Sequence, residues 1–191
     1  MADYYSPTVI QQTIPEADMT PLERLILTHI FDADVEDDGL YFHSQQGPSD
    51  VISVFRAELE AALAVSRTHH SVANALAAEQ LRTAADDDDN KEIELDLRVT
   101  SWEFLLQNIV QRSSALRYIT AITSYTCSKM LPDGFGGSAL FITADSIQGQ
   151  STDEFLADCL ADIAADPADR PSRGHRPPGP ASGNGSDNDD R

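Results

Sequence analysis

The strongest constraint on the fold is a hairpin pattern between residues 116 and 147. Two runs rich in Ile, Thr, Tyr and Phe flank the six residues 132–137, three of which are glycine. Aromatic and β-branched side chains favour strands, and glycine allows the positive φ that many turns need. A connection of six residues is longer than a two-residue type I′ or II′ turn, so the rules for those turns do not predict its conformation. The pattern predicts a hairpin at the core of the sheet on which the other elements pack.

Three capping boxes predict where helices begin. A hydroxyl residue is followed three positions later by Glu at Thr20–Glu23, Thr100–Glu103 and Ser151–Glu154. In such a box each side chain bonds the backbone N–H of the other residue, and apolar residues at helical spacing follow each one here. Two further helices are expected after the Gly-Pro-Ser-Asp stretch at 47–50 and after a break near Thr68.

The apolar spacing also predicts which face each helix buries. The first helix would bury Leu22, Leu25, Ile26, His29 and Ile30. The second would bury Val51, Phe55, Leu59 and Leu63. The last would bury Phe155, Leu156, Cys159, Leu160 and Ile163. Each set recurs at the three- and four-residue steps of an amphipathic helix, so all three helices are expected to pack against the core.

Two further strands and an acidic loop complete the predicted elements. Residues 32–38 are interpreted as a loop that leads into a short strand at 40–43, and residues 92–99 alternate strictly between charged and apolar side chains. Strict alternation indicates a strand with one buried and one solvated face. The element order α-β-α-α-β-α-β-β-α predicts an α+β fold, with a mainly antiparallel sheet built around the hairpin and helices on one face.

Composition divides the chain into three parts. Residues 1–19 form an extended N-terminal arm, in which Pro7 and Pro15 prevent a long regular element. Residues 20–166 form a single α+β domain. Residues 167–191 are rich in Pro, Gly, Ser, Asn and Asp, offer almost nothing to bury, and are expected to be a disordered tail.

The net charge of −19 limits the classes of partner. The tail has equal numbers of arginines and aspartates, so the whole excess falls on residues 1–166. An acidic domain repels phosphate backbones and anionic lipid, which disfavours direct binding to nucleic acid or membrane and leaves a basic protein surface as the expected partner. No apolar run has the length of a membrane span and no secretory signal precedes the domain, so a cytoplasmic location is expected.

One acidic stretch resembles half of a calcium loop. Asp34, Glu36, Asp38 and Gly39 match the first six positions of an EF-hand loop, whose ligands are carboxylate and carbonyl oxygens. The twelfth position is Gln45, which cannot supply the bidentate carboxylate. A solvated acidic turn explains these residues better than a metal site, so they are a weak metal candidate and no metal or cofactor is expected.

No assembled catalytic set is visible. Ser138 and Ser146 lack the glycine elbow of a hydrolase nucleophile, and the glycine-rich connection leads into a strand, unlike a phosphate-binding loop. Cys127 and Cys159 lack the spacing of a redox pair and are interpreted as small buried hydrophobes.

Two features are candidates for partner binding. Glu92, Glu94 and Asp96 would be held in fixed order on the wet face of the alternating strand. Phe135 is a large aromatic residue at a glycine-rich tip, where it must pack or be presented to a partner.

Two blocks carry a resemblance to a known family. They are TPLERLILTHIFDA, residues 20–33, and LRYITAITSYTCSKMLPDGFGGSALFITADSIQGQSTDEFLADCL, residues 116–160. Together they resemble a family of uncharacterised small acidic proteins of alphaproteobacterial chromosomes and plasmids. The resemblance implies a bacterial setting and, through the plasmids, maintenance or host-defence functions. It assigns no activity and no functional residue.

Four functions remain open. The leading hypothesis is a non-enzymatic acidic module that binds proteins. The second is a DNA mimic that inhibits a nuclease or another DNA-binding protein. Mimicry would need the carboxylates to form a stripe, whereas general acidity would scatter them over the surface. The third is a secretion-type chaperone, by analogy of size, acidity and element order. The fourth is an enzyme whose site is assembled from distant residues.

Overall fold

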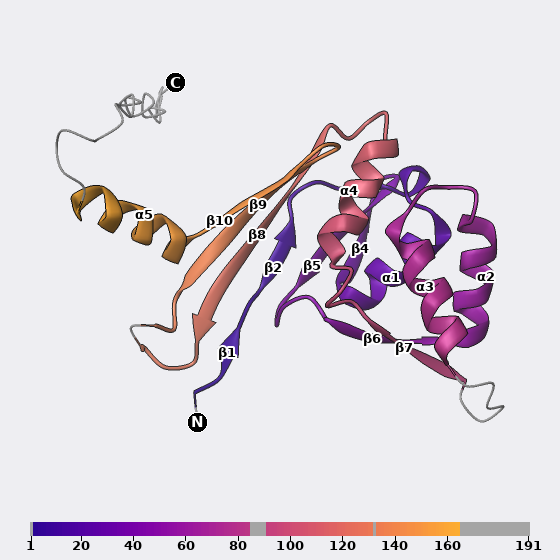
Figure 1. Cartoon of the computed structure of the whole chain (residues 1–191), viewed down its shortest axis with the longest axis horizontal. Helices are drawn as coiled ribbons and strands as arrows, with labels where there is room; N and C mark the ends of the chain where they lie inside the picture. Colours follow the sequence, from indigo (N-terminus) through magenta and orange to yellow (C-terminus); the bar gives the residue numbers. More distant parts are fainter. Residues whose placement is uncertain (1, 85–90, 132, 165–191) are drawn as a thin grey trace, which may run out of the picture. The chain divides into compact units, whose positions relative to one another are not determined.

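A computed structural model describes residues 2–84, 91–131 and 133–164 (Figure 1). The chain divides into two compact units, Met1–Leu156 and Ala157–Arg191, which are described separately. The tail expected to be disordered, 167–191, lies outside the described residues, as does the aspartate run 86–89. Within the described residues, no helix is both long enough and apolar enough to cross a membrane.

One antiparallel sheet of eight strands dominates the first unit. Its main path runs β10-β9-β8-β2-β5-β3, with β1 paired to β8 and β4 paired to β5. The predicted hairpin is confirmed, because β8 and β9 pair from Tyr118 opposite Thr143 to Tyr125 opposite Gly136. The strands are β1 (Tyr4–Tyr5), β2 (Thr8–Ile10), β3 (Ile14–Pro15), β4 (Asp32–Glu36), β5 (Gly39–Ser44), β8 (Tyr118–Cys127), β9 (Gly136–Thr143) and β10 (Ile147–Ser151).

Helices lie on one face of this sheet, as predicted (Figure 1). Ile119 and Ile142 pair across β8 and β9 on that face and are fully buried, while Tyr118 and Phe141 point to the other face and stack on each other in the solvent. Helix α4 (Trp102–Arg112) contacts β8 and β9, and α1 (Pro21–Ile30) contacts β4. Helices α2 (Arg56–Ser66) and α3 (Val72–Thr83) pack against α1, which the short 3-10 helix η1 (Glu16–Asp18) precedes. The fold is therefore α+β with a mainly antiparallel sheet.

The N-terminal segment lies inside the sheet. β2 pairs with β8 on one side and β5 on the other, and Ile10 and Ile14 are fully buried. Pro7 and Pro15 stand at the ends of this stretch, where they do not remove hydrogen bonds from the three-residue β2. The segment interpreted as an extended arm is thus part of the structural core.

The interpretation of residues 32–38 as a loop is wrong. Residues 32–36 form β4, which pairs along its whole length with β5, and the turn follows at Asp37, whose φ is 51°. Aspartate is rare in strands because of its own local hydrogen bonds, but an edge strand lets its carboxylates point to water while the ladder holds the backbone.

The helix expected from Val51 onward begins five residues later. Residues 51–55 form strand β6, and α2 starts at Arg56. Within β6 the buried side chains are Ile52 and Val54, whereas Val51 and Phe55 are exposed. The four-residue step from Val51 to Phe55 suits a helix and a strand equally well, and the β-branched run Val-Ile-Ser-Val decides for the strand.

The segment between the alternating strand and α4 also departs from the prediction. Strand β7 spans Glu92–Asp96, and Val99 is 89% exposed instead of buried. The N-cap of α4 is Ser101, without a side-chain cap bond, so the box predicted at Thr100–Glu103 does not form. The boxes at Thr20–Glu23 and Ser151–Glu154 do form.

The burial predicted for the last helix is wrong. Among the described residues, helix α5 (Thr152–Ala164) buries none of its side chains. The exposed fractions are 54% for Phe155, 56% for Leu156, 67% for Leu160 and 73% for Ile163. Cys159 is partly buried, while Cys127 is buried as expected. An amphipathic pattern predicts an apolar stripe but does not say what covers it.

A buried ion pair joins three helices. Glu23 is fully buried, in contrast to the predicted His29, which is exposed. The Glu23 carboxylate accepts hydrogen bonds from the Thr20 N–H (2.9 Å), from the Ser71 hydroxyl (2.6 Å) and from the Arg112 guanidinium. Since Ser71 is the N-cap of α3 and Arg112 ends α4, this one carboxylate fixes both helices against α1.

The capping boxes give a first test of this structure. Thr20→Ala should lower the free energy of unfolding by about 1 kcal/mol, because the Glu23 N–H loses its cap. Thr100→Ala should change it by less than about 0.5 kcal/mol, because no cap bond is formed there. Urea denaturation measures both values, and equal losses in the two variants would contradict the assigned helix starts.

The buried ion pair gives a second test. Arg112→Met should lower the free energy of unfolding by about 3–5 kcal/mol, because the Glu23 carboxylate is left buried without its charged partner. The matched control is Arg24→Met, which removes an arginine paired with Glu16 at the surface and should cost at most about 1 kcal/mol. Similar costs in the two variants, measured by chemical denaturation, would rule out a structural role for the buried pair.

Candidate partner-binding face

The second sheet is a two-stranded ribbon, β6 (Val51–Phe55) with β7 (Glu92–Asp96), which contacts α1, α2 and α3. Its register places Val51 opposite Asp96, Ser53 opposite Glu94 and Phe55 opposite Glu92. Residues directly opposite each other in antiparallel strands point to the same side. These six side chains therefore share one surface, which we call the acidic ribbon face: Val51, Ser53, Phe55, Glu92, Glu94 and Asp96.

The reverse side of the ribbon anchors this face to the core. Ile52, Val54, Ile93 and Leu95 are each at most 4% exposed and belong to the main hydrophobic cluster. The strict alternation predicted for β7 is confirmed between Glu92 and Asp96. Because a strand alternates its side chains, burial of one side fixes the direction of the acidic side chains.

The acidic ribbon face also presents apolar surface. Phe55 is 52% exposed and Val51 is 40% exposed. The aromatic residue lies beside Glu92, whose carboxylate accepts a hydrogen bond from the Ser53 hydroxyl at 2.7 Å. An aromatic side chain among ordered carboxylates can contact both an apolar group and the cation next to it.

The charge on this face is only partly neutralised. Arg98 donates to Asp96 from its backbone N–H (3.0 Å) and from its Nε (2.9 Å) and Nη2 atoms. These bonds lower the pKa of Asp96 from 3.8 to about 2, and the pKa of Arg98 is raised by Asp96 and by the charges of Asp50 and Glu94. The six residues of the face hold three carboxylates and no cation of their own.

Phe135, the other predicted partner-binding residue, is not part of this face. It is 46% exposed and lies in the connection between β8 and β9. That connection belongs to the eight-stranded sheet, whereas the acidic ribbon face belongs to the two-stranded one. The structure thus brings Glu92, Glu94 and Asp96 together and leaves Phe135 apart.

The half calcium loop forms a β-hairpin. Asp34 and Glu36 lie in β4, and Asp38 follows in the turn. The Asp34 carboxylate is 3.1 Å from the His43 ring, and that of Glu36 accepts from the Thr13 hydroxyl at 2.9 Å. Over residues 2–84, 91–131 and 133–164, no group of three or more His, Cys, Asp or Glu side chains could hold a metal ion.

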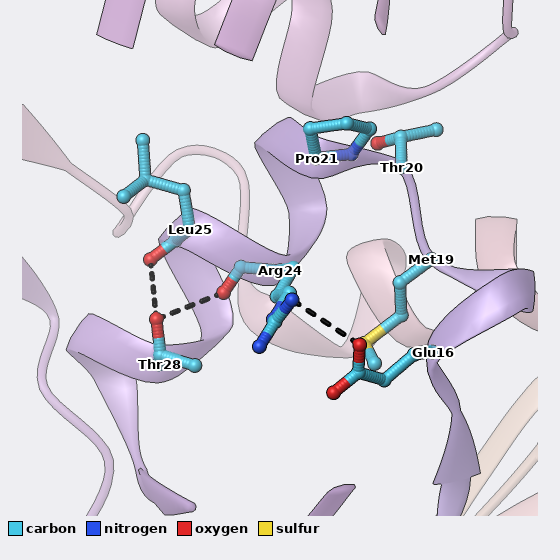
Figure 2. Close-up of a pocket in the computed structure, with 7 residues that line it drawn as sticks. All are labelled: Glu16, Met19, Thr20, Pro21, Arg24, Leu25 and Thr28. Carbon is cyan, nitrogen blue, oxygen red and sulfur yellow. Dashed lines mark hydrogen bonds and ion pairs between the residues drawn. The ribbon is translucent and has the colours of Figure 1, made fainter. Parts of the chain in front are cut away.

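An open hollow of about 390 Å³ lies along the start of α1 (Figure 2). Its polar groups bond to one another: Arg24 pairs with Glu16 at 3.2 Å, and the Thr28 hydroxyl donates to the backbone carbonyls of Arg24 and Leu25. The Arg24 and Glu16 side chains and the Thr28 hydroxyl therefore already have partners within the lining.

A second open hollow, of about 490 Å³, lies beside the start of α4. Its lining includes Ser101, Glu103, Phe104, Asp145 and Ser146. Glu103 therefore lines this hollow instead of capping the helix, and its buried Oε2 atom has no hydrogen-bond partner among the described residues. The Ser146 hydroxyl lies 3.1 Å from that of Thr143. No nucleophile paired with a base is formed among these described lining residues.

Sequence reasoning missed the apolar half of the acidic ribbon face. Val51 and Phe55 were assigned to the buried stripe of a helix, which hid their position beside Glu92 and Asp96. The signal that would have found them is the β-branched run Val-Ile-Ser-Val at 51–54, which favours a strand.

A scan against protein-family models and searches of the curated proteins and of the solved structures found no match. The resemblance described for residues 20–33 and 116–160 therefore stays a prediction.

The Asp96–Arg98 pair gives a third test. The lowered pKa means that this ion pair stabilises the folded state above pH 3.8 and that the stabilisation is lost as the pH falls through about 2. In a ¹³C NMR titration the Asp96 carboxyl should have its midpoint near 2, and Arg98→Gln should move it toward 3.8. The control Arg24→Gln should leave it unchanged. A wild-type midpoint near 3.8 would show that the pair does not form.

Proposed function

We propose that the protein is a non-enzymatic binding module that captures a basic segment of a partner protein on its acidic ribbon face. The observation that carries the proposal is the register of β6 and β7, which places Phe55 and Val51 on the same surface as Glu92, Glu94 and Asp96. Ordered carboxylates beside exposed apolar side chains complement a partner segment that carries both cationic and apolar side chains.

The expected partner segment carries Lys or Arg next to apolar side chains. Long-range attraction from an acidic chain speeds encounter with a cationic partner, and the net charge of −19 strengthens that field. Aromatic residues often dominate binding energy when they become desolvated, and a cation over the ring face adds to this. Phe55 therefore has the role of anchor, while Glu92 and Glu94 provide steering and orientation.

DNA mimicry is the second candidate, favoured by one observation on β4. Asp32, Asp34 and Glu36 alternate along this strand on one side and are all exposed. Alternate residues of a strand are about 6.8 Å apart, which is about twice the axial rise per phosphate of a DNA strand. A mimic would use this stripe and would not need Phe55. The chaperone and enzyme hypotheses have no comparable support among the described residues.

The fourth test separates these two functions with matched charge changes. The probe is a synthetic amphipathic peptide of leucine and lysine, titrated by fluorescence anisotropy against the full chain. Glu92→Gln with Glu94→Gln should weaken its binding by roughly tenfold, whereas Asp32→Asn with Asp34→Asn should weaken it less than about threefold. Phe55→Ser should weaken binding without changing its salt dependence, because it removes no charge.

Three outcomes contradict the proposal. Equal losses in the two double variants would mean that only the total charge matters. A larger loss in the Asp32 and Asp34 variant would assign binding to the β4 stripe and favour mimicry. Affinity that does not fall as salt rises from about 50 to 300 mM would exclude electrostatic capture altogether.

A further inference from the structure

Strand β10 (Ile147–Ser151) forms one edge of the main sheet. It pairs with β9 and ends the strand order. An edge strand presents a row of backbone donors and acceptors that can pair with another chain. In this sheet the opposite edge is β4, so the two edges can be compared directly.

The hydrogen-bond pattern shows which β10 groups point outward. The Thr143 N–H donates to the Ser146 carbonyl at 2.8 Å, so these two residues form a hydrogen-bonded pair at the turn. Such pairs alternate along an antiparallel ladder, and therefore Gln148 bonds to β9 while Ile147 and Gly149 direct their N–H and C=O groups away from it. The N–H of Ser151 is used by Glu154 in the capping box.

Unlike β4, β10 has neither a charged side chain nor a proline among its five residues. Proteins protect edge strands with charged side chains, proline or bulges. Three of the five residues of β4 are acidic, whereas β10 has the sequence Ile-Gln-Gly-Gln-Ser, with neither charge nor proline. The edge that can accept a strand is thus β10.

The charge around β10 indicates what kind of partner strand could pair with it. Residues 130–156, which lie in the same unit as β10, contain four acidic residues and neither Lys nor Arg. Asp145 precedes β10, and Asp153 follows it. A second copy of this chain would bring the same negative charges together, whereas a basic strand would complement them. Phe155 and Leu156, exposed in the first turn of α5, follow β10 directly in sequence and supply apolar surface.

We propose that β10 binds an extended, basic segment of a partner protein, which adds to the sheet as a further strand. The backbone groups of Ile147 and Gly149 would provide the hydrogen bonds, as in other cases of strand addition. The acidic residues of 130–156, among them Asp145 and Asp153 beside β10, would select a segment with lysine or arginine at alternate positions. This surface is separate from the acidic ribbon face, and the inference stands without it.

Gly149 allows a matched pair of variants. A Cβ atom at this position meets Leu140 Cδ2, the end of a flexible side chain that can shift. Gly149→Ala and Gly149→Pro both introduce that contact, but only proline removes the outward N–H. Proline is tolerated on an edge strand where the N–H faces solvent, so the β9–β10 hydrogen bonds remain.

The experiment uses a capped nine-residue peptide of alternating lysine and valine as the probe. Its affinity for the full chain, measured by fluorescence anisotropy, should be similar for the wild type and Gly149→Ala and about tenfold weaker for Gly149→Pro. In the wild type, NMR should show rapid hydrogen exchange of the Ile147 and Gly149 amides and slow exchange of the Gln148 amide. Saturating peptide should slow exchange at Ile147 and Gly149. This second measurement needs no variant and holds even if proline disturbs the fold.

Four results would overturn the proposal. Peptide binding that is unchanged in Gly149→Pro would exclude the edge, and equal weakening in Gly149→Ala would trace the effect to Leu140. Weakening by Glu92→Gln with Glu94→Gln, without slower exchange at Gly149, would place the peptide on the acidic ribbon face. A wild-type dimer in sedimentation that persists in Gly149→Ala but dissociates in Gly149→Pro would make a second copy the occupant.

Discussion

The arrangement of the helices depends on the buried carboxylate of Glu23. A carboxylate without exposure to water is tolerated only when donors surround it, and here they come from the start of α1, from the cap of α3 and from the end of α4. Any other packing of these helices would leave the charge unpaired. The ribbon of β6 and β7 contacts α1, α2 and α3, so the direction of the acidic ribbon face follows from the same constraint.

Local signals in the sequence predicted much of the fold. The hairpin of β8 and β9, the capping box at Thr20 and the alternation in β7 were all predicted, because each depends on neighbouring residues. The errors at 32–36 and 51–55 arose where one pattern suits two structures. Val51 and Phe55 fit a helical step and a strand alike. The β-branched run at 51–54 favours the strand, and pairing with β7, about 40 residues away, fixes it. The acidic half of the candidate face was predicted because the alternation in residues 92–96 is a local pattern. Its aromatic half was not predicted, because Val51 and Phe55 were assigned to a helix.

Long-range contacts set the limit of sequence reasoning. The capping box placed Glu23 at the third position of α1, but its complete burial depends on Ser71 and Arg112, which are remote in sequence. In the same way, the amphipathic pattern of α5 predicted an apolar stripe that the described residues leave exposed. Whether a polar side chain is buried or an apolar one is exposed depends on the residues that pack against it. These residues are often remote in sequence, so a local pattern does not predict them.

The exposure of α5 has a thermodynamic consequence. The helix has 13 residues and buries none of its side chains, and isolated helices of this length are marginal in water. The start of the helix is supported by the Ser151–Glu154 box. With so little burial among the described residues, we expect α5 to fray at a lower temperature than that at which the sheet unfolds. A partner that covers the stripe would fold the helix as it binds, so part of the binding free energy would go into ordering this segment.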